Sequence, residues 1–425
     1  MPAAAPRLTF LPDLLEEHIE EVEFLWAQRE AAFTSTRRTM RDLAHLDDRI
    51  EAHVEGIRAV GTPALELLTE RIAGDDVHAV FAGAYPMLRL GDPTAGDQVV
   101  EAFATADGPR LGGIRRALTF GAAPAQLAPL RDLLLSANPA VAAAALEVLA
   151  FNGASPDGHG RLLLLVRDDA PEVRERAWHA AAFINTSLDP KLYAAAMRDE
   201  SPVVRDAALL AAAWCRVPGA LAFARQLAER PSLENLRTLE LLAVLGTPED
   251  LPRIRALARN PDLGPSRFAL PASFGHPALV DDLIAQMAGP DPAAAIGAGE
   301  AFTRMTGAGV DSAERVRFPA GGAEPQDDFE AEFQEEALLP DSALARREWD
   351  RLKARLASVT RMAGGLDLTA GITAEAAERL DLRSRGEAYL RARYHGQWTG
   401  SPRDLQRFPQ PAPRLDAGQS EVHIR

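Results

Sequence analysis

The segment NPAVAAAALEVLAFNG, residues 138–153, recurs in two altered copies, APEVRERAWHAAAFIN (170–185) and SPVVRDAALLAAAWCR (201–216). Each copy has a proline at its second position, and these prolines lie 32 and then 31 residues apart. Proline suits the first turn of a helix, because the N–H that it lacks would have no partner there. A period near 31 with two helical patterns in each unit is typical of an α-solenoid. We therefore predict an all-α fold, an α-α superhelix of stacked helical pairs.

Similar helix starts recur on both sides of these copies, so we assign residues 63–307 to a repeat solenoid of about eight units. The preceding residues, 1–62, hold two long amphipathic helical patterns, at 14–33 and 40–60. Because a solenoid needs its terminal unit covered, we expect this part to be an N-terminal helical cap.

The repeat pattern ends before residue 308. Residues 308–340 are expected to form an acidic linker, because residues 321–336 hold seven acids and no base. Residues 341–425 are expected to form a small C-terminal appendage with helices and a stretch, 389–408, in which aromatic residues alternate with arginines. That alternation could stack on single-stranded nucleic acid. We favour the other interpretation, in which the aromatic rings pack on the last repeats and the arginines meet acidic residues.

Composition limits the partners. The chain has 425 residues, a net charge of −15 and 47% apolar residues, so it can bury a large core but is a poor general binder of phosphate backbones. A single cysteine, Cys215, excludes an internal disulfide and a multi-cysteine zinc site. No apolar run approaches 18 residues, and the first residues lack a signal-peptide pattern. We expect a soluble, cytoplasmic protein without a membrane partner.

Two of the copies share a Val-Arg pair just after the proline, Val173 with Arg174 and Val204 with Arg205. This motif resembles the short form of the HEAT repeat. The resemblance implies that the second helix of each pair lines the concave surface. It also implies that the repeated arginine bonds an acid between neighbouring units, for which Asp169, Asp199 and Glu200 are available.

Three other segments, 21–33 (EVEFLWAQREAAF), 43–61 (LAHLDDRIEAHVEGIRAVG) and 300–307 (EAFTRMTG), are similar to an uncharacterised proteobacterial family often encoded beside type VI secretion genes. The resemblance implies a protein partner, such as a secretion effector or its apparatus. Arg49 and His53 match the family's LDxRxxAHxxG stretch and lie one helical turn apart. We interpret them as a capping or docking feature.

Catalytic signatures are lacking. The sequence has no phosphate-binding loop, no nucleophile elbow, no dinucleotide fingerprint and no repeated His-Glu dipeptide for a di-iron site. We expect no catalytic residue, cofactor or metal. The enzymatic alternative is a HEAT-like DNA glycosylase or another nucleic-acid-binding protein. The acidic body disfavours it, and we expect no nucleic acid partner.

The sequence thus favours a non-enzymatic, protein-binding scaffold, an adaptor or chaperone-like protein, whose cargo would be a secretion protein. A broad groove would support binding, whereas a deep pocket that gathers His, Asp or Glu from several repeats would support catalysis. Besides Arg49 and His53, the residues predicted to face the partner lie on second helices of the repeats: Asp189, Lys191, Tyr193, Arg253 and Arg255.

Overall fold

The computed structural model describes residues 12–154, 160–186, 188–318 and 335–408. Of these, residues up to 215 together with 400–408 form one compact unit, called unit 1, and residues from 216 to 399 form a second, called unit 2. Helices make up almost all of the regular structure, and consecutive helices contact one another along the chain. The prediction of an all-α, solenoid-like fold is confirmed.

Unit 1 consists of helices, with η denoting a short 3-10 helix. In chain order they are α1 (Pro12–Ala32), α2 (Met40–Val60), η1 (Thr62–Ala64), α3 (Leu65–Ile72), α4 (Val77–Arg89), α5 (Pro93–Thr105), α6 (Gly108–Gly121), α7 (Pro124–Leu133), α8 (Pro139–Phe151), α9 (Gly160–Leu165), α10 (Pro171–Ile184), α11 (Pro190–Ala196), α12 (Pro202–Trp214) and α23 (Pro402–Gln406). The two long helices expected at the N-terminus are α1 and α2, which pack on each other.

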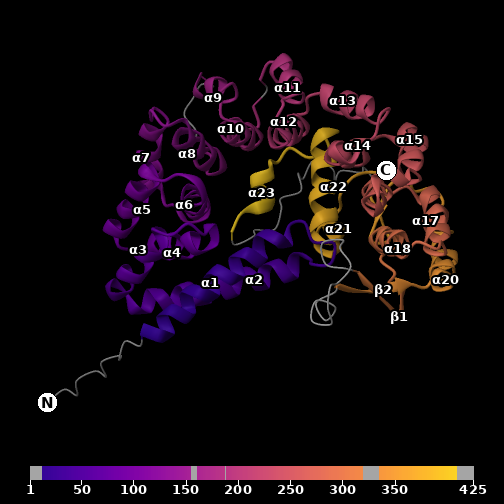
Figure 1. The fold of residues 1–425 in the computed structure, drawn as a ribbon, viewed down its shortest axis with the longest axis horizontal. Coiled ribbons are helices and arrows are strands. Elements are labelled where there is room, and N and C mark those ends of the chain that lie inside the picture. Colours follow the sequence, from indigo (N-terminus) through magenta and orange to yellow (C-terminus); the bar gives the residue numbers. More distant parts are fainter. Residues whose placement is uncertain (1–11, 155–159, 187, 319–334, 409–425) are drawn as a thin grey trace, which may run out of the picture. The chain divides into compact units, whose positions relative to one another are not determined.

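From α3 onward, the helices of unit 1 alternate between two rows. Figure 1 shows α4, α6, α8, α10 and α12 along the inner side of the arc, with α3, α5, α7, α9 and α11 outside them. The inner row contains the helices that open with the repeated prolines, so the expectation that second helices line the inner surface is wrong. Small side chains explain the difference. Helix α8 is buried from Val141 to Phe151 and is rich in alanine, which lets inner helices pack closely.

Local signals set the helix starts, as the sequence predicts. The side chain of Asn138 accepts a hydrogen bond from the Ala140 N–H at 3.0 Å, and Pro139 occupies the first turn of α8. The Asp189 carboxylate accepts from the Lys191 N–H at 2.9 Å in front of α11. Each cap satisfies a backbone donor that the helix itself cannot pair.

The repeated arginine links neighbouring repeats, as the Val-Arg motif implies. Arg174 donates from Nε and Nη2 to the two carboxylate oxygens of Asp199, at 2.9 and 2.7 Å. Its Nη1 also donates to the carbonyls of Asp168 and Asp169, at 2.8 Å each. Arg205 repeats the carbonyl contacts one unit later, to Asp199 and Glu200. These contacts fix the turn between consecutive helical pairs.

Unit 2 continues the paired helices and then adds short strands. Its elements are α13 (Gly219–Leu227), η2 (Leu233–Asn235), α14 (Leu236–Leu245), η3 (Pro248–Asp250), α15 (Leu251–Ala258), η4 (Pro261–Leu263), η5 (Pro265–Phe268), α16 (Ala269–Phe274), η6 (Pro277–Leu279), α17 (Val280–Met287), α18 (Pro292–Thr306), β1 (Asp311–Phe318), β2 (Glu335–Pro340), α20 (Ser342–Leu352), β3 (Met362–Ala363), β4 (Leu366–Asp367), α21 (Ala374–Arg379) and α22 (Leu382–Tyr394). Helices α14, α16 and α18 contact one another in turn.

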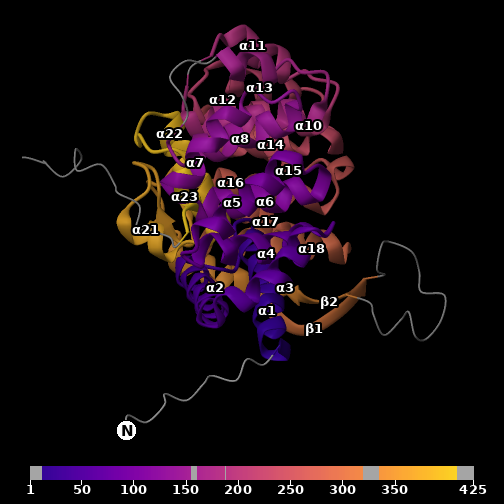
Figure 2. The ribbon, with the colours of Figure 1, turned by 90° about the vertical axis from the view of Figure 1, so that its left-hand side faces the viewer.

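The segment 308–340, expected as an acidic linker, contains an antiparallel hairpin of β1 and β2 (Figure 2). Residues 319–334, which include most of the acidic run, lie outside the described residues. Glu336 on β2 accepts hydrogen bonds from Arg315 and Arg317 on β1, at 3.1 and 2.9 Å. The basic residues of the first strand thus pair with an acid of the second, and the described ends of this segment form regular structure.

The C-terminal appendage packs on the helical repeats of unit 2. Helix α20 contacts α17 and α18, and α22 contacts α14. Tyr389 is fully buried and Trp398 nearly so, with ring centroids 4.7 Å apart. The packing interpretation of the aromatic-basic stretch is therefore confirmed for these two rings, which are not free to stack on nucleic acid bases.

Candidate functional site

Unit 1 holds a C-terminal segment of the chain on its inner row. This segment, residues 400–408, contains the short helix α23, which contacts α10 and lies on the inner side of the row in Figure 1. Ser401 precedes the helix, and its N–H donates to the Asp404 carboxylate at 2.8 Å. Pro402 and Leu405 are buried. The segment is therefore folded against the repeats rather than loosely attached.

Arg29 on α1 holds the end of this segment through its backbone. The Arg29 Nη2 donates to the carbonyls of Gln406 and Arg407, both at 3.2 Å, while its Nε donates to Asp47 at 2.7 Å. Arg29 is only 1% exposed, and burial lowers its pKa, although Asp47 opposes the shift. Four aromatic rings lie within 4.8 to 5.3 Å of its guanidinium carbon: Trp26, Phe33, Phe120 and Phe408.

Phe408 supplies the main side-chain contact at the end of the segment. Its ring lies edge-on to Trp26 and Tyr85, with centroid distances of 6.0 and 5.6 Å. At the other end, Arg403 lies against Gly153, where a Cβ atom would come within 2.7 Å of the Arg403 Nη1. Carbonyl contacts and apolar contacts thus act together along the segment, an arrangement that can hold a peptide.

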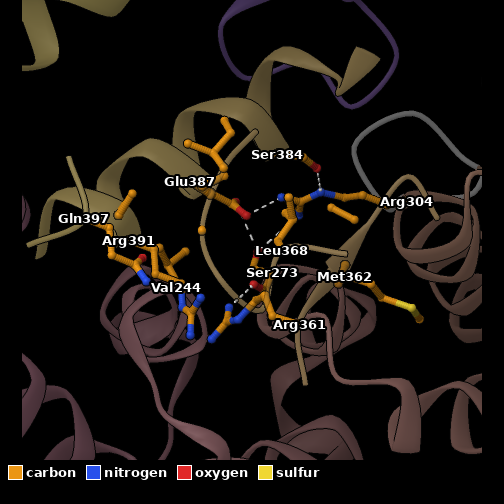
Figure 3. A pocket seen from close by; sticks show the side chains of 16 residues that line it. Val244, Ser273, Arg304, Arg361, Met362, Leu368, Ser384, Glu387, Arg391 and Gln397 are labelled. Carbon is orange, nitrogen blue, oxygen red and sulfur yellow. Dashed lines mark hydrogen bonds and ion pairs between the residues drawn. The ribbon is translucent and has the colours of Figure 1, made fainter. Parts of the chain in front are cut away.

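Unit 2 contains a small cavity of about 30 Å³, lined by charged and polar side chains from α16, α18, α22 and two loops, together with apolar side chains (Figure 3). Arg304 on α18 donates from Nε to the Ser384 hydroxyl at 2.8 Å and from Nη1 to the Ser273 hydroxyl at 3.1 Å. It also forms an ion pair with Glu387 on α22. Glu387 is the one carboxylate in the lining.

Two further arginines line this cavity and form no close ion pair with a carboxylate of the described residues. Arg361 is 5% exposed and donates only to backbone carbonyls, those of Ala243, Ser273 and Gly246 at 2.8 to 3.0 Å. The Nε of Arg391 on α22 is buried and has no hydrogen-bond partner. Burial holds the pKa of Arg361 well below its ordinary value, and repulsion by Arg391 adds to the shift.

The predicted docking pair Arg49 and His53 lies on α2 and is partly exposed. Arg49 forms an ion pair with Glu21 on α1 at 3.3 Å. The His53 Nδ1 lies 2.9 Å from the Nδ1 of His18 on α1. Burial lowers the pKa of His53, and the nearby His18 lowers it further. Both residues thus connect the two cap helices, and their role in docking stays a prediction.

The predicted residues on α11 have mixed positions. Asp189 caps the helix, and the side chain of Lys191 is exposed. Tyr193 is 0% exposed, with its hydroxyl donating to the Thr186 carbonyl at 3.2 Å. The prediction that Tyr193 contacts a partner is wrong, because the ring packs inward against Trp178. Helix α11 also belongs to the outer row.

Arg253 and Arg255 on α15 already have acidic partners. Arg253 donates to Asp250 at 2.7 Å, and Arg255 donates to Asp282 at 2.8 Å and to the Ala278 carbonyl at 2.7 Å. Arg255 therefore joins α15 to α17 in the way that Arg174 joins repeats of unit 1. Their contact with a partner stays a prediction.

Several residues of the two sites lie in segments noted in the sequence, Arg29 in 21–33, Arg304 in 300–307, and Arg391, Arg403 and Phe408 in 389–408, but none was predicted to form a peptide or anion site. The roles of Arg29 and Arg361 could not be recognised, because their backbone partners lie far along the chain. One signal was present: Asp47, the partner of Arg29, lies in the LDxRxxAHxxG stretch. An aspartate flanked by the apolar positions Leu46 and Ile50 of an amphipathic helix indicates a buried ion pair.

No group of three or more His, Cys, Asp or Glu residues in the described part of the chain could hold a metal ion. None of the helices described is both long and apolar enough to cross a lipid bilayer.

Comparison with known proteins does not place the chain in a family. No family model matches, and no curated protein matches. A similar solved structure is the crystal structure of an engineered protein, at 16% sequence identity and a TM-score of 0.32, covering 68% of this chain and 88% of that one.

Proposed function

We propose that the protein is a non-enzymatic scaffold that binds a protein partner through the inner row of unit 1. The observation that supports this function is the segment 400–408, which the inner row and Arg29 of α1 already hold as a folded peptide. The HEAT-like motif is consistent with an adaptor role in the cytoplasm. The resemblance to the family encoded beside type VI secretion genes suggests a secretion effector or its apparatus as the partner.

The contacts of the segment define the chemistry of the partner. Arg29 donates to two backbone carbonyls, so it can recognise the end of a helical turn whatever its side chains. The side-chain contacts come from Pro402, Leu405 and Phe408, which are spaced by three residues. The partner would carry a similar Pro-x-x-Leu-x-x-Phe segment and would replace the chain's own.

Tethering makes the internal segment a strong competitor. A segment joined to its site by the chain has an effective concentration on the order of millimolar. A free peptide at micromolar concentration would therefore not bind the native chain. It would bind once the contacts of the internal segment are weakened.

The test uses the full chain with Leu405→Ala and Phe408→Ala together. We expect a fluorescent peptide of residues 400–408 (GSPRDLQRF) to bind this variant in a fluorescence anisotropy titration and not to bind the native chain. A peptide with Phe408→Ala should bind about tenfold more weakly, because losing about 1.4 kcal/mol of apolar contact gives that factor.

The matched control is Phe24→Ala, since Phe24 lies on α1 near Arg29 but is 56% exposed. This variant should behave as the native chain does. Circular dichroism establishes that each variant is folded. A folded double variant that does not bind the peptide, or a native chain that binds it equally well, would contradict the proposal.

A further inference from the structure

The lining of the cavity in unit 2 carries more positive than negative charge, and this charge is wholly or partly buried. Its lining contains three guanidinium groups, those of Arg304, Arg361 and Arg391, and one carboxylate, that of Glu387. Glu387 forms its ion pair with Arg304, and it also accepts from Arg383 outside the cavity. Arg361 and Arg391 form no ion pair of their own among the described residues, and Glu387 and Asp250 attract Arg361 only from a longer distance.

Carbonyl contacts do not neutralise these two arginines. The three carbonyls around Arg361 satisfy hydrogen-bond donors but carry no net charge. Arg391 lacks even this compensation at its Nε. Buried charges in proteins are normally paired, because removing an ion from water without a partner costs several kcal/mol. The fully buried Arg361 and the partly buried Arg391 therefore favour an anion at this cavity.

The polar groups around the cavity are those that bind oxyanions. Guanidinium groups present a planar fork of donors that matches phosphate oxygens, and hydroxyl groups add single donors. The Ser384 hydroxyl, which accepts from the Arg304 Nε, can supply such a donor, whereas the Ser273 hydroxyl already donates to Glu387 at 3.1 Å. Figure 3 shows the labelled side chains of Arg304, Ser384, Glu387 and Ser273 grouped on one side, with Arg391 on the other.

We propose that this cavity binds a dianionic oxyanion, either inorganic phosphate or the terminal group of a phosphate monoester, with Arg391 as its principal ligand. A phosphate carries about two negative charges at neutral pH, which equals the unpaired positive charge of the lining. The cavity volume of about 30 Å³ is roughly twice what one water needs, so it admits a small group and no extended ligand. Gln397, which is exposed and lines the cavity, marks the side on which the remainder of a monoester would lie.

The proposal is independent of peptide binding, since no residue of the cavity belongs to unit 1. The test is calorimetric titration of the full chain with inorganic phosphate, methyl phosphate and acetate, at constant ionic strength set by sodium chloride. We expect phosphate to bind and to raise the Tm, and acetate to bind at least tenfold more weakly. Methyl phosphate distinguishes the two ligands. If it binds as tightly as inorganic phosphate, the ligand is a phosphate monoester; if it does not bind, the ligand is inorganic phosphate.

Arg391→Gln should weaken phosphate binding at least tenfold without unfolding the chain, because its Nε makes no hydrogen bond. Arg391→Lys keeps the positive charge but loses the planar pair of guanidinium donors, so its affinity for phosphate should lie between those of Arg391→Gln and the native chain. Arg351→Gln is the control, since its side chain is 73% exposed on α20. The proposal is wrong if the native chain binds no phosphate at concentrations up to about 10 mM. It is also wrong if acetate binds as tightly as phosphate, or if the Arg391→Gln variant binds phosphate as tightly as the native chain does.

Discussion

Buried arginines at single positions hold distant parts of this chain together. Arg29 pairs with Asp47 while it binds the backbone of residues 406 and 407, and Arg361 ties its loop to α14 and α16 through carbonyls. Such residues combine a charge that must be compensated with donors that can reach several acceptors. Removing the acidic partner of a buried arginine therefore lowers the stability of the protein more than removing an exposed ion pair does.

At this scale we predict that Asp47→Ala lowers the free energy of unfolding by about 3–5 kcal/mol, because it leaves the Arg29 charge buried and unpaired. Asp48→Ala is the matched control, since Asp48 is the next residue on α2 and is exposed. It should change stability by less than about 0.5 kcal/mol. Urea denaturation followed by circular dichroism measures both. Similar losses for the two variants would show that the buried pair is not responsible.

Close packing between helices depends on small residues at the crossings of the inner row. Gly113 on α6 faces α4, where a Cβ atom would lie 2.6 Å from the Val80 Cβ and 2.7 Å from the Val77 carbonyl oxygen. Gly83 on α4 meets α3 in the same way, 2.7 Å from the Leu68 carbonyl oxygen. At these positions the helix backbones approach too closely for a side chain.

For the element scale we predict that Gly113→Ala destabilises the protein by about 1–3 kcal/mol, the usual cost of overpacking. Alanine has a higher helix propensity than glycine by about 1 kcal/mol. A loss of stability would therefore have to come from the contact between α6 and α4. Gly219→Ala at the start of α13 serves as the control, because nothing lies within 4 Å of its added Cβ. Thermal denaturation should show a lower Tm for Gly113→Ala and no decrease for Gly219→Ala.

Histidines with a lowered pKa across the molecule make its stability depend on pH. Burial is the main cause of a lowered pKa for four histidines: His53, His179, His276 and His395. Unfolded histidines take up protons near pH 6.5, whereas the folded ones remain neutral until lower pH. The unfolded state therefore binds more protons in this window, and stability falls as the pH falls.

We predict that the Tm decreases from pH 7.5 to pH 5.5 and decreases again below about pH 4. The second decrease follows from carboxylates whose pKa is held low by arginine and backbone partners, such as Asp199 and Asp282. Differential scanning calorimetry in buffers of equal ionic strength measures both. His179→Gln should reduce the first decrease, whereas His45→Gln, at an exposed position, should not. A Tm that is constant between pH 7.5 and 5.5 would contradict the prediction.

The sequence by itself determined the helical pairs, their period and most of their starts. These features depend on residues within one or two turns of each other, such as Asn138 with the Ala140 N–H in front of α8, and such patterns can be read directly. The repeated Arg174 was also predictable, because its partner Asp199 lies one repeat away.

Only the tertiary structure decided which row is inner, which residues surround the cavity and where the C-terminal segment lies. Arg29 and the Gln406 carbonyl are 377 residues apart, and Arg361 and the Ala243 carbonyl are 118 apart. A backbone carbonyl is the same for every residue type, so neither contact leaves a pattern in the sequence. The pairing of β1 with β2 likewise depends on arginines that meet Glu336 across the hairpin, which the run of acids alone does not indicate.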